Sequence, residues 1–260
     1  MRNRIYFFTG TGNSLKVAKN IAEALPDCEL VAICKNTSLE IPEDCERIGF
    51  VFPTYAGGPP KMVAEFIHNM ELPSQGKTYL FAIATYGGNA GSVIAQTDKL
   101  IKQKEWSLNY AATIWSYPNL VIAYPMIKGV RFFTKMSNRT SRKVSKEIVS
   151  KQHESISEIK EYSRKMYDSY MIEIHGTDKD FTVNDNCISC EVCKNVCLAN
   201  NITINGGIPT FQHQCESCMA CIQHCPKRAI NYKNKTQKRG RYTHPDIRYQ
   251  TIIKSQGELL

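Results

Sequence analysis

The sequence has no apolar run long enough to cross a membrane. Its longest apolar stretch, residues 120–127, contains Pro125 and ends at Lys128, well short of the roughly 20 residues that span a bilayer. The start of the chain also lacks the apolar core of a secretory signal, because only residues 5–8 are apolar before Thr9. We therefore expect a soluble, cytoplasmic protein without a transmembrane segment.

Several catalytic signatures are missing as well. The first glycine-rich loop lacks the Gly-Lys-[Ser/Thr] end of a nucleoside-triphosphate loop, and the G-x-G-x-x-G spacing of dinucleotide-binding proteins is absent. The scattered serine, histidine and aspartate residues suggest no hydrolytic triad. These absences disfavour nucleotide hydrolysis, nicotinamide-dependent hydride transfer and serine-hydrolase chemistry.

Cysteines are abundant and clustered. Eight of the eleven lie within residues 187–225, in two runs of C-x2-C-x2-C-x3-C, a spacing that indicates metal binding rather than disulfides in a chain without an export signal. The second run repeats the first 28 residues further on, together with its flanks: residues 181–183, 187–197 and 202–204 correspond to 209–211, 215–225 and 230–232. This repeat predicts a small domain with pseudo-twofold symmetry.

The spacing of these runs is typical of paired [4Fe-4S] centres, in which each run gives three thiolates to one cluster and its fourth to the other. The predicted ligand sets are Cys187, Cys190, Cys193 and Cys225 for one cluster, and Cys215, Cys218, Cys221 and Cys197 for the other. Two structural zinc sites using the same thiolates are the alternative, although the C-x2-C-x2-C triplet fits zinc poorly.

Further predictions concern two residues near the cysteine runs and the three cysteines outside them. Leu198 follows the first run where Pro226 follows the second, which affects local geometry but removes no ligand. His224 is expected at the surface, since cysteines already fill the ligand count. The remaining cysteines, Cys28, Cys34 and Cys45, are scattered and are expected to be small core residues.

The first two thirds of the chain alternate between apolar runs of strand length and helical patterns. Strands are predicted near residues 4–8, 29–34, 47–52, 79–85 and 109–115, and helices near 13–25, 61–70, 90–102 and, as one long polar helix, 141–167. Such alternation is typical of an α/β fold, a doubly wound parallel sheet of five strands. Ligands bind such sheets at the carboxyl ends of the strands, so the loops after residues 8, 52, 85 and 115 are the candidates.

The loop after the first strand has the composition of a phosphate-binding turn. It consists of Thr9, Gly10, Thr11, Gly12, Asn13 and Ser14. Glycines permit a tight turn, backbone N–H groups at a helix start attract an anion, and the hydroxyls can donate to phosphate oxygens. This loop resembles the phosphate loop of flavodoxins; a plain helix-capping turn is the alternative.

Two later loops combine tyrosine with glycine, which suits stacking and close backbone approach to a planar ring. The first contains Pro53, Thr54, Tyr55, Ala56, Gly57 and Gly58; the second contains Thr85, Tyr86, Gly87, Gly88, Asn89 and Gly91. Corresponding loops hold the isoalloxazine ring in flavodoxin-like proteins, so we predict FMN as the cofactor. Residues 115–119 could add a further wall, and simple turns are the alternative for any single glycine.

The formal charge of +9 is concentrated in two segments. Residues 128–151 carry eight basic residues and one acidic residue, and residues 233–248 carry six and one. Nucleic acid is therefore a partner to consider. Charge runs are usually solvated faces, however, and docking of an acidic redox protein explains them equally well, so nucleic-acid binding is the less favoured interpretation.

The combination of these glycine-rich loops with paired cluster motifs resembles the EFR1 family of flavodoxin-ferredoxin fusion proteins. The resemblance implies a flavodoxin-like FMN domain over residues 1–175, a small α+β ferredoxin-like domain with two [4Fe-4S] clusters over 176–235, and a basic C-terminal tail over 236–260. It implies electron transfer between FMN and the clusters, to or from a redox partner protein or a small-molecule acceptor or donor.

Two other functions stay open. An FMN-dependent reductase would act on a specific small molecule, with residues 119–136 as a lid or substrate wall; the plainer interpretation of that segment is a helix that packs on the sheet edge or docks the second domain. A redox-sensing nucleic-acid-binding protein is the third alternative. The sequence assigns no catalytic residue and no oligomeric state.

Overall fold

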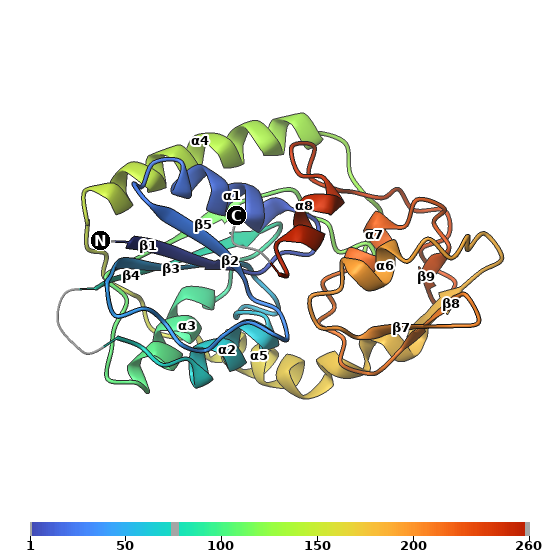
Figure 1. The fold of residues 1–260 in the computed structure, drawn as a ribbon, viewed down its shortest axis with the longest axis horizontal. Coiled ribbons are helices and arrows are strands. Elements are labelled where there is room, and N and C mark those ends of the chain that lie inside the picture. The colour runs from blue at the N-terminus through green and yellow to red at the C-terminus, as the bar shows by residue number, and fades with distance from the viewer. Residues whose placement is uncertain (1, 74–77, 258–260) are drawn as a thin grey trace.

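Five parallel strands form the central sheet of the N-terminal part of the chain (Figure 1). The computed structural model describes residues 2–73 and 78–257. The strands are β1 (Arg2–Phe7), β2 (Cys28–Ala32), β3 (Cys45–Pro53), β4 (Tyr79–Tyr86) and β5 (Tyr110–Trp115). Their order is β2-β1-β3-β4-β5, which is the flavodoxin-like order of doubly wound sheets. The predicted five-stranded parallel α/β sheet is confirmed.

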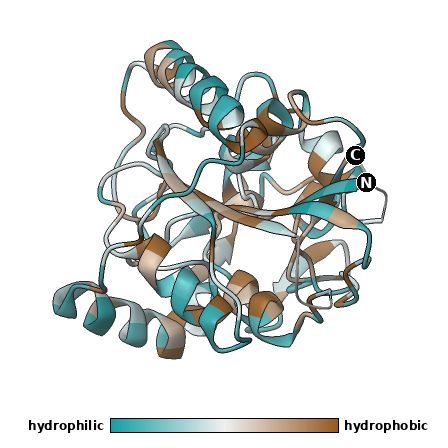
Figure 2. Ribbon diagram, turned by 90° about the vertical axis from the view of Figure 1, so that its left-hand side faces the viewer, coloured by the Kyte–Doolittle hydropathy of each residue, from teal (hydrophilic) through white to brown (hydrophobic). Residues whose placement is uncertain are grey.

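Helices cover both faces of this sheet (Figures 1 and 2). One layer contains α1 (Asn13–Ala22) and α4 (Val130–Val149), and the other contains α2 (Lys61–Asn69), α3 (Val93–Lys102) and α5 (Glu161–Glu173). Strands covered on both faces must be apolar throughout, and residues 5–8, 50–52 and 80–84 are all fully buried or nearly so.

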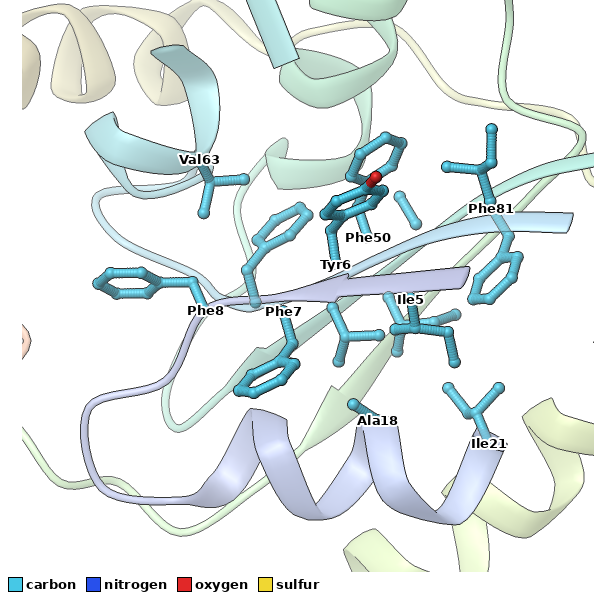
Figure 3. Close-up of a cluster of buried hydrophobic side chains, with 14 of the residues drawn as sticks. Ile5, Tyr6, Phe7, Phe8, Ala18, Ile21, Phe50, Val63 and Phe81 are labelled. Carbon is cyan, nitrogen blue, oxygen red and sulfur yellow. The ribbon is translucent and has the colours of Figure 1, made fainter. Parts of the chain in front are cut away.

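The side chains of β1 show how the two layers are joined (Figure 3). Ile5 and Phe7 point towards Ala18 of α1, whereas Tyr6 points to the opposite side, where Val63 of α2 lies. Alternation of this kind follows from the twofold period of a strand. This alternation fixes the register of β1, because a slip by one residue would exchange the side chains that face α1 with those that face α2.

The predicted helix over residues 141–167 is wrong. The structure has two helices there, because the chain crosses from one face of the sheet to the other between Val149 and Glu161. The crossing segment is tied to the sheet edge: the N–H of Glu154 donates to the carbonyl of Asn109 at 2.9 Å. Polar composition alone did not reveal this break, since the sequence there contains neither proline nor glycine.

The cysteine-rich part consists of two small antiparallel sheets and two short helices. Its elements are η1 (Ile174–Asp180), β6 (Phe181–Val183), α6 (Val192–Asn195), β7 (Ile202–Asn205), β8 (Ile208–Phe211), α7 (Ala220–His224) and β9 (Ile230–Tyr232). Strand β6 pairs with β9, and β7 pairs with β8. Each pair therefore joins one strand from each half of the 28-residue repeat.

The backbone repeats as closely as the sequence. Three pairs of residues 28 positions apart have φ between 49° and 62°: Ser189 and Ser217, Glu191 and Met219, and Asn200 and Arg228. Left-handed backbone is uncommon for residues other than glycine. Its recurrence at matching positions supports the pseudo-twofold arrangement that the repeat predicts.

The two parts pack against each other through apolar side chains. Leu198, which replaces the proline of the motif, is buried in the core of the large sheet, and Ile247 and Ile252 reach the same core from the C-terminal segment. That segment includes α8 (Tyr249–Lys254). In return, Val121 from the loop after β5 lies in the core of the cysteine-rich part, so residues 119–127 dock the two parts together.

None of the helices in the described part of the chain combines the length and the apolar character needed to cross a bilayer.

Candidate functional site

Four loops meet at the carboxyl edge of the sheet and line a partly open cavity of about 50 Å³. We call it the edge cavity. Eleven of the predicted cofactor-binding residues line it: Thr9, Gly10, Thr11, Asn13, Ser14, Pro53, Thr54, Tyr55, Thr85, Tyr86 and Gly87. Ser116, Tyr117 and Asn119, from the predicted additional wall, line it too, as does Cys218. The described lining residues include no Asp, Glu, Lys or Arg, so any anion would be bound by neutral donors.

A network of hydroxyl groups orients the first loop. The Thr9 hydroxyl accepts the Gly12 N–H at 3.1 Å, the Ser14 hydroxyl lies 2.8 Å from that of Thr85, and the Asn119 amide donates to the Thr11 hydroxyl. A hydroxyl that accepts a hydrogen bond can still donate one of its own. The first-turn N–H groups of α1 lack partners within the helix. The loop therefore offers several neutral donors at one helix terminus, which suits a phosphate.

Thr54 presents a buried polar atom without a partner. Its hydroxyl oxygen is shielded from solvent and has no hydrogen-bond partner among the described residues. Leaving such a group unpaired costs about 1–3 kcal/mol. A bound molecule with a polar edge in this cavity would satisfy it.

Tyr55 shapes the same wall of the edge cavity. Its ring lies edge-on to that of Phe8, with centroids 6.5 Å apart. Burial raises the pKa of the Tyr55 hydroxyl well above its ordinary value, so this side chain stays neutral.

Seven of the predicted residues do not line the edge cavity: Gly12, Ala56, Gly57, Gly58, Gly88, Asn89 and Gly91. Two of them have a packing role instead. A Cβ on Gly57 would lie 2.5 Å from the Ser163 hydroxyl, and one on Gly58 would lie 2.3 Å from the Tyr167 ring. These glycines let α5 approach the loop closely, so their occurrence in the sequence has a structural reason.

The eight clustered cysteines surround two further cavities. The outer cavity is lined by Cys187, Cys190, Cys193 and Cys225, and the inner cavity by Cys197, Cys215, Cys218 and Cys221; each has a volume of about 20 Å³. Each cavity thus combines three cysteines of one run with the last cysteine of the other run. The structure brings together the same two sets that the spacing predicts, although their role as ligands stays a prediction.

Backbone N–H groups face the sulfur atoms. Ala229 donates to Cys225 at 3.2 Å and Asn201 donates to Cys197 at 3.4 Å, which are matching bonds in the two halves of the repeat. Ser217 donates to Cys215 at 3.3 Å. Such hydrogen bonds stabilise thiolates, and around iron–sulfur clusters they tune the reduction potential.

Burial opposes ionisation of these thiols in the absence of a cation. It raises the pKa of Cys193 to about 11 and that of Cys218 to about 12. A bound metal reverses this preference, because a coordinating thiol is deprotonated. Among the described residues, no group of three or more His, Cys, Asp or Glu side chains has the geometry to hold a metal ion.

The edge cavity and the inner cavity meet at Cys218, which lines both. A Cβ on Gly10 would lie 2.1 Å from the Cys218 carbonyl oxygen, so only glycine allows this approach. His224 supports the same contact: its Nε2 lies 3.1 Å from the Gly10 carbonyl oxygen and donates to it. The expectation of a surface histidine is wrong, because His224 is 8% exposed and packs between the two parts.

Glu216, which lines the inner cavity, forms a hydrogen bond with the start of α2 beside the large sheet. The carboxylate accepts the N–H of Met62, at the start of α2, at 3.1 Å. Burial raises the pKa of Glu216 to about 7, although the Met62 hydrogen bond acts in the opposite direction. The inner cavity is thus held against the sheet at several points.

The C-terminal segment covers the first loop. The N–H of His244 donates to the Thr11 carbonyl at 2.8 Å, and the Tyr242 hydroxyl donates to the Asn13 side chain at 2.6 Å. The Tyr242 ring also stacks on that of Tyr117, with centroids 4.1 Å apart. No motif in the sequence indicated this return of the chain, and only the structure places these residues beside the edge cavity.

The other three cysteines belong to the packing of the large sheet, as predicted. Cys45 is buried in its core, and Cys28 and Cys34 pack against that core.

No protein-family model matches the chain, and no curated protein matches it. Solved structures give only distant likenesses. Rubredoxin oxygen:oxidoreductase from the anaerobe Desulfovibrio gigas is 13% identical, with a TM-score of 0.38 over 55% of this chain and 36% of its own. An FMN-dependent NADH-azoreductase from Bacillus anthracis, solved with FMN, is 10% identical, with a TM-score of 0.38 over 57% of this chain and 99% of its own.

The Trp repressor binding protein of Bacillus subtilis is 14% identical, with a TM-score of 0.38 over 55% of this chain and 96% of its own. Likenesses this distant carry no functional argument. The fold assignment rests on the strand order and on the parallel pairing described above.

Proposed function

We propose that this chain is an electron-transfer protein that holds FMN in the edge cavity and one [4Fe-4S] cluster in each cysteine-lined cavity. In domain terms, residues 1–175 would be a flavodoxin-like domain, residues 176–235 a ferredoxin-like domain, and residues 236–260 a basic C-terminal tail, of which Tyr242 and His244 contact the first loop. The observation that carries the proposal is that Cys218 lines both the edge cavity and the inner cavity.

The residues of the edge cavity fit a flavin nucleotide. Thr9, Thr11 and Ser14 would bind the phosphate, together with the N–H groups at the start of α1. The unpaired Thr54 hydroxyl and the tyrosines Tyr55 and Tyr86 would face the ring system. Bound there, FMN would exchange electrons one or two at a time, and the protein would set its orientation and surroundings.

The cysteine-lined cavities fit soft iron centres. Four cysteines line each of them, the remaining walls are largely apolar, and backbone N–H groups donate to three of the sulfur atoms. Thiolates are the ligands that iron–sulfur clusters take. Cys193 of the outer cavity and Cys215 of the inner cavity belong to one cluster of buried side chains, against which Cys221 packs, so the two cavities adjoin.

Anaerobic purification with quantification of iron, sulfide, zinc and flavin tests this proposal. We expect about eight irons, about eight sulfides and one FMN per chain. Zinc in place of iron would overturn the cluster assignment. A chain that takes up iron but no flavin on reconstitution would overturn the FMN assignment and leave the iron–sulfur part standing.

A further inference from the structure

A larger hollow lies beside α4. It is an open groove of about 830 Å³ between this helix and Pro245 and Asp246 of the C-terminal segment. Six basic side chains of α4 line it: Arg131, Lys135, Arg139, Arg142, Lys143 and Lys146. The groove is more than ten times as large as the edge cavity of about 50 Å³, so it suits an extended surface better than a single small molecule.

The basic side chains form a stripe. Residues 131, 135, 139, 142 and 146 recur every three or four positions and therefore share one face of the helix. The helix has 20 residues, so the stripe extends for much of about 30 Å. All six side chains are exposed, and among the described residues only Lys143 forms an ion pair, with Glu147 at 3.6 Å.

Exposed apolar side chains lie near this basic stripe. Phe132 is 55% exposed and Met136 is 36% exposed, one turn further along α4. Trp115, at the end of β5, is 38% exposed and lies edge-on to Phe132, with ring centroids 6.0 Å apart. Aromatic and methionine side chains with a charged surround are the usual composition of a protein–protein interface.

Two contacts connect the surroundings of the groove to the edge cavity. Trp115, which lies against Phe132 of α4 and outside the groove lining, donates its indole N–H to the Gly87 carbonyl at 3.0 Å, and Gly87 lines the cavity. On the other wall, Pro245 follows His244, whose N–H donates to the carbonyl of the cavity residue Thr11. A protein bound along α4 would therefore sit beside the proposed flavin.

We propose that the basic face of α4, with Trp115 and Phe132 at one end, docks an acidic one-electron carrier protein beside the edge cavity. This inference rests on the proposed function. In each encounter the reduced carrier would lose one electron and this chain would gain one, with no bond formed or broken. The exposed Trp115 and Phe132 at the end of the stripe and the position next to the cavity favour an acidic redox protein over nucleic acid.

The test measures binding to a small acidic ferredoxin with two [4Fe-4S] clusters, by titration calorimetry with the holoprotein. We expect binding at 20 mM salt that weakens about tenfold or more at 200 mM, because exposed charges are screened. The triple variant Lys135→Glu, Arg139→Glu, Arg142→Glu should bind about tenfold more weakly or worse at low salt. The control Lys235→Glu, Lys238→Glu, Lys254→Glu has the same change in net charge outside the groove and should bind within about twofold of the parent.

Iron and flavin are quantified in every sample, which separates two kinds of failure. A parent protein without these cofactors would overturn the proposed function and the docking inference together. A fully loaded parent that binds no ferredoxin, or a control variant as impaired as the groove variant, would overturn docking alone. Competition by a 20-base-pair DNA duplex, lost in the groove variant only, would reassign the groove to nucleic acid.

Discussion

Gly10 and Cys218 touch across the two parts of the chain: a Cβ on Gly10 would lie 2.1 Å from the Cys218 carbonyl oxygen. Gly10 belongs to the proposed phosphate loop, and Cys218 is a proposed ligand of the inner cluster. The contact leaves no room for a side chain at position 10 and joins the proposed flavin site to the proposed iron–sulfur site.

Replacing Gly10 by alanine should disturb both sites. The methyl group forces the Cys218 backbone away, and overpacking of this kind costs about 1–3 kcal/mol of stability. We expect weaker FMN binding and partial loss of iron, towards about four per chain. Flavin and iron are quantified after anaerobic purification. Gly176→Ala is the matched control, because a Cβ there meets nothing within 4 Å and Gly176 lines none of the three cavities; equal losses in both variants would contradict the account.

Paired cysteine substitutions test which thiolates share a cluster. Cys193 and Cys225 line the outer cavity, whereas Cys221 lines the inner one. The double variant Cys193→Ser, Cys225→Ser should therefore keep about four irons, and the double variant Cys221→Ser, Cys225→Ser should lose most of about eight. If each run held its own cluster, the two iron contents would be exchanged, which makes the metal analysis decisive.

Thr54→Val removes a hydroxyl that has no partner in the described structure. Without ligand, we expect stability that is unchanged or about 1 kcal/mol higher, since an unsatisfied buried group is lost. FMN should bind about tenfold more weakly, a difference of about 1.4 kcal/mol. Fluorescence titration of the flavin measures this. Thr54→Ser should retain most of the affinity, and the exposed Thr113→Val should match the parent; a fall in both controls would count against the assignment.

His244 should make the C-terminal segment sensitive to acid. Burial lowers the pKa of His244 from 6.5 to about 4, and the neutral ring accepts the Asp246 N–H at Nδ1, 3.2 Å away. The stabilisation is present above about pH 6.5 and is lost as the pH falls towards 4. Between pH 7 and pH 5, the loss amounts to about 2 kcal/mol.

Denaturant unfolding of parent and His244→Asn at both pH values checks this prediction. Asparagine can accept the same backbone N–H two residues on without titrating in this range, so the variant should lose about 2 kcal/mol less than the parent on acidification. His68→Asn, on the exposed side of α2, should behave like the parent. Identical acid sensitivity in all three proteins would show that His244 does not control this step.

Much of this architecture could be predicted because its signals are local. The run Ile5 to Phe8 ends in a loop of threonine and glycine, which indicated both a buried strand and a binding turn. The cysteine spacing indicated ligand sets, and the two cavities gather those sets around Cys193 and Cys221. Period and spacing encode such features within a few residues, so no knowledge of distant contacts was needed.

The features that sequence reasoning missed depend on distant contacts. Leu198 looked like a small departure from a motif, yet it anchors the cysteine-rich part in the core of the large sheet. His224 looked like a surface residue because its partner, the Gly10 carbonyl, lies 214 positions away. Helix α4 ends at Val149 because the chain must then cross the edge of the sheet, and no local sequence pattern indicated this crossing.

The measurement that tests the central claim most directly is pulsed one-electron reduction of the holoprotein, followed at flavin and iron–sulfur wavelengths. With Cys218 shared by the edge and inner cavities, an electron that arrives at one centre should redistribute to the other within a single chain. We predict a first-order redistribution whose rate does not depend on protein concentration. A rate proportional to protein concentration, or no redistribution at all, would contradict the account.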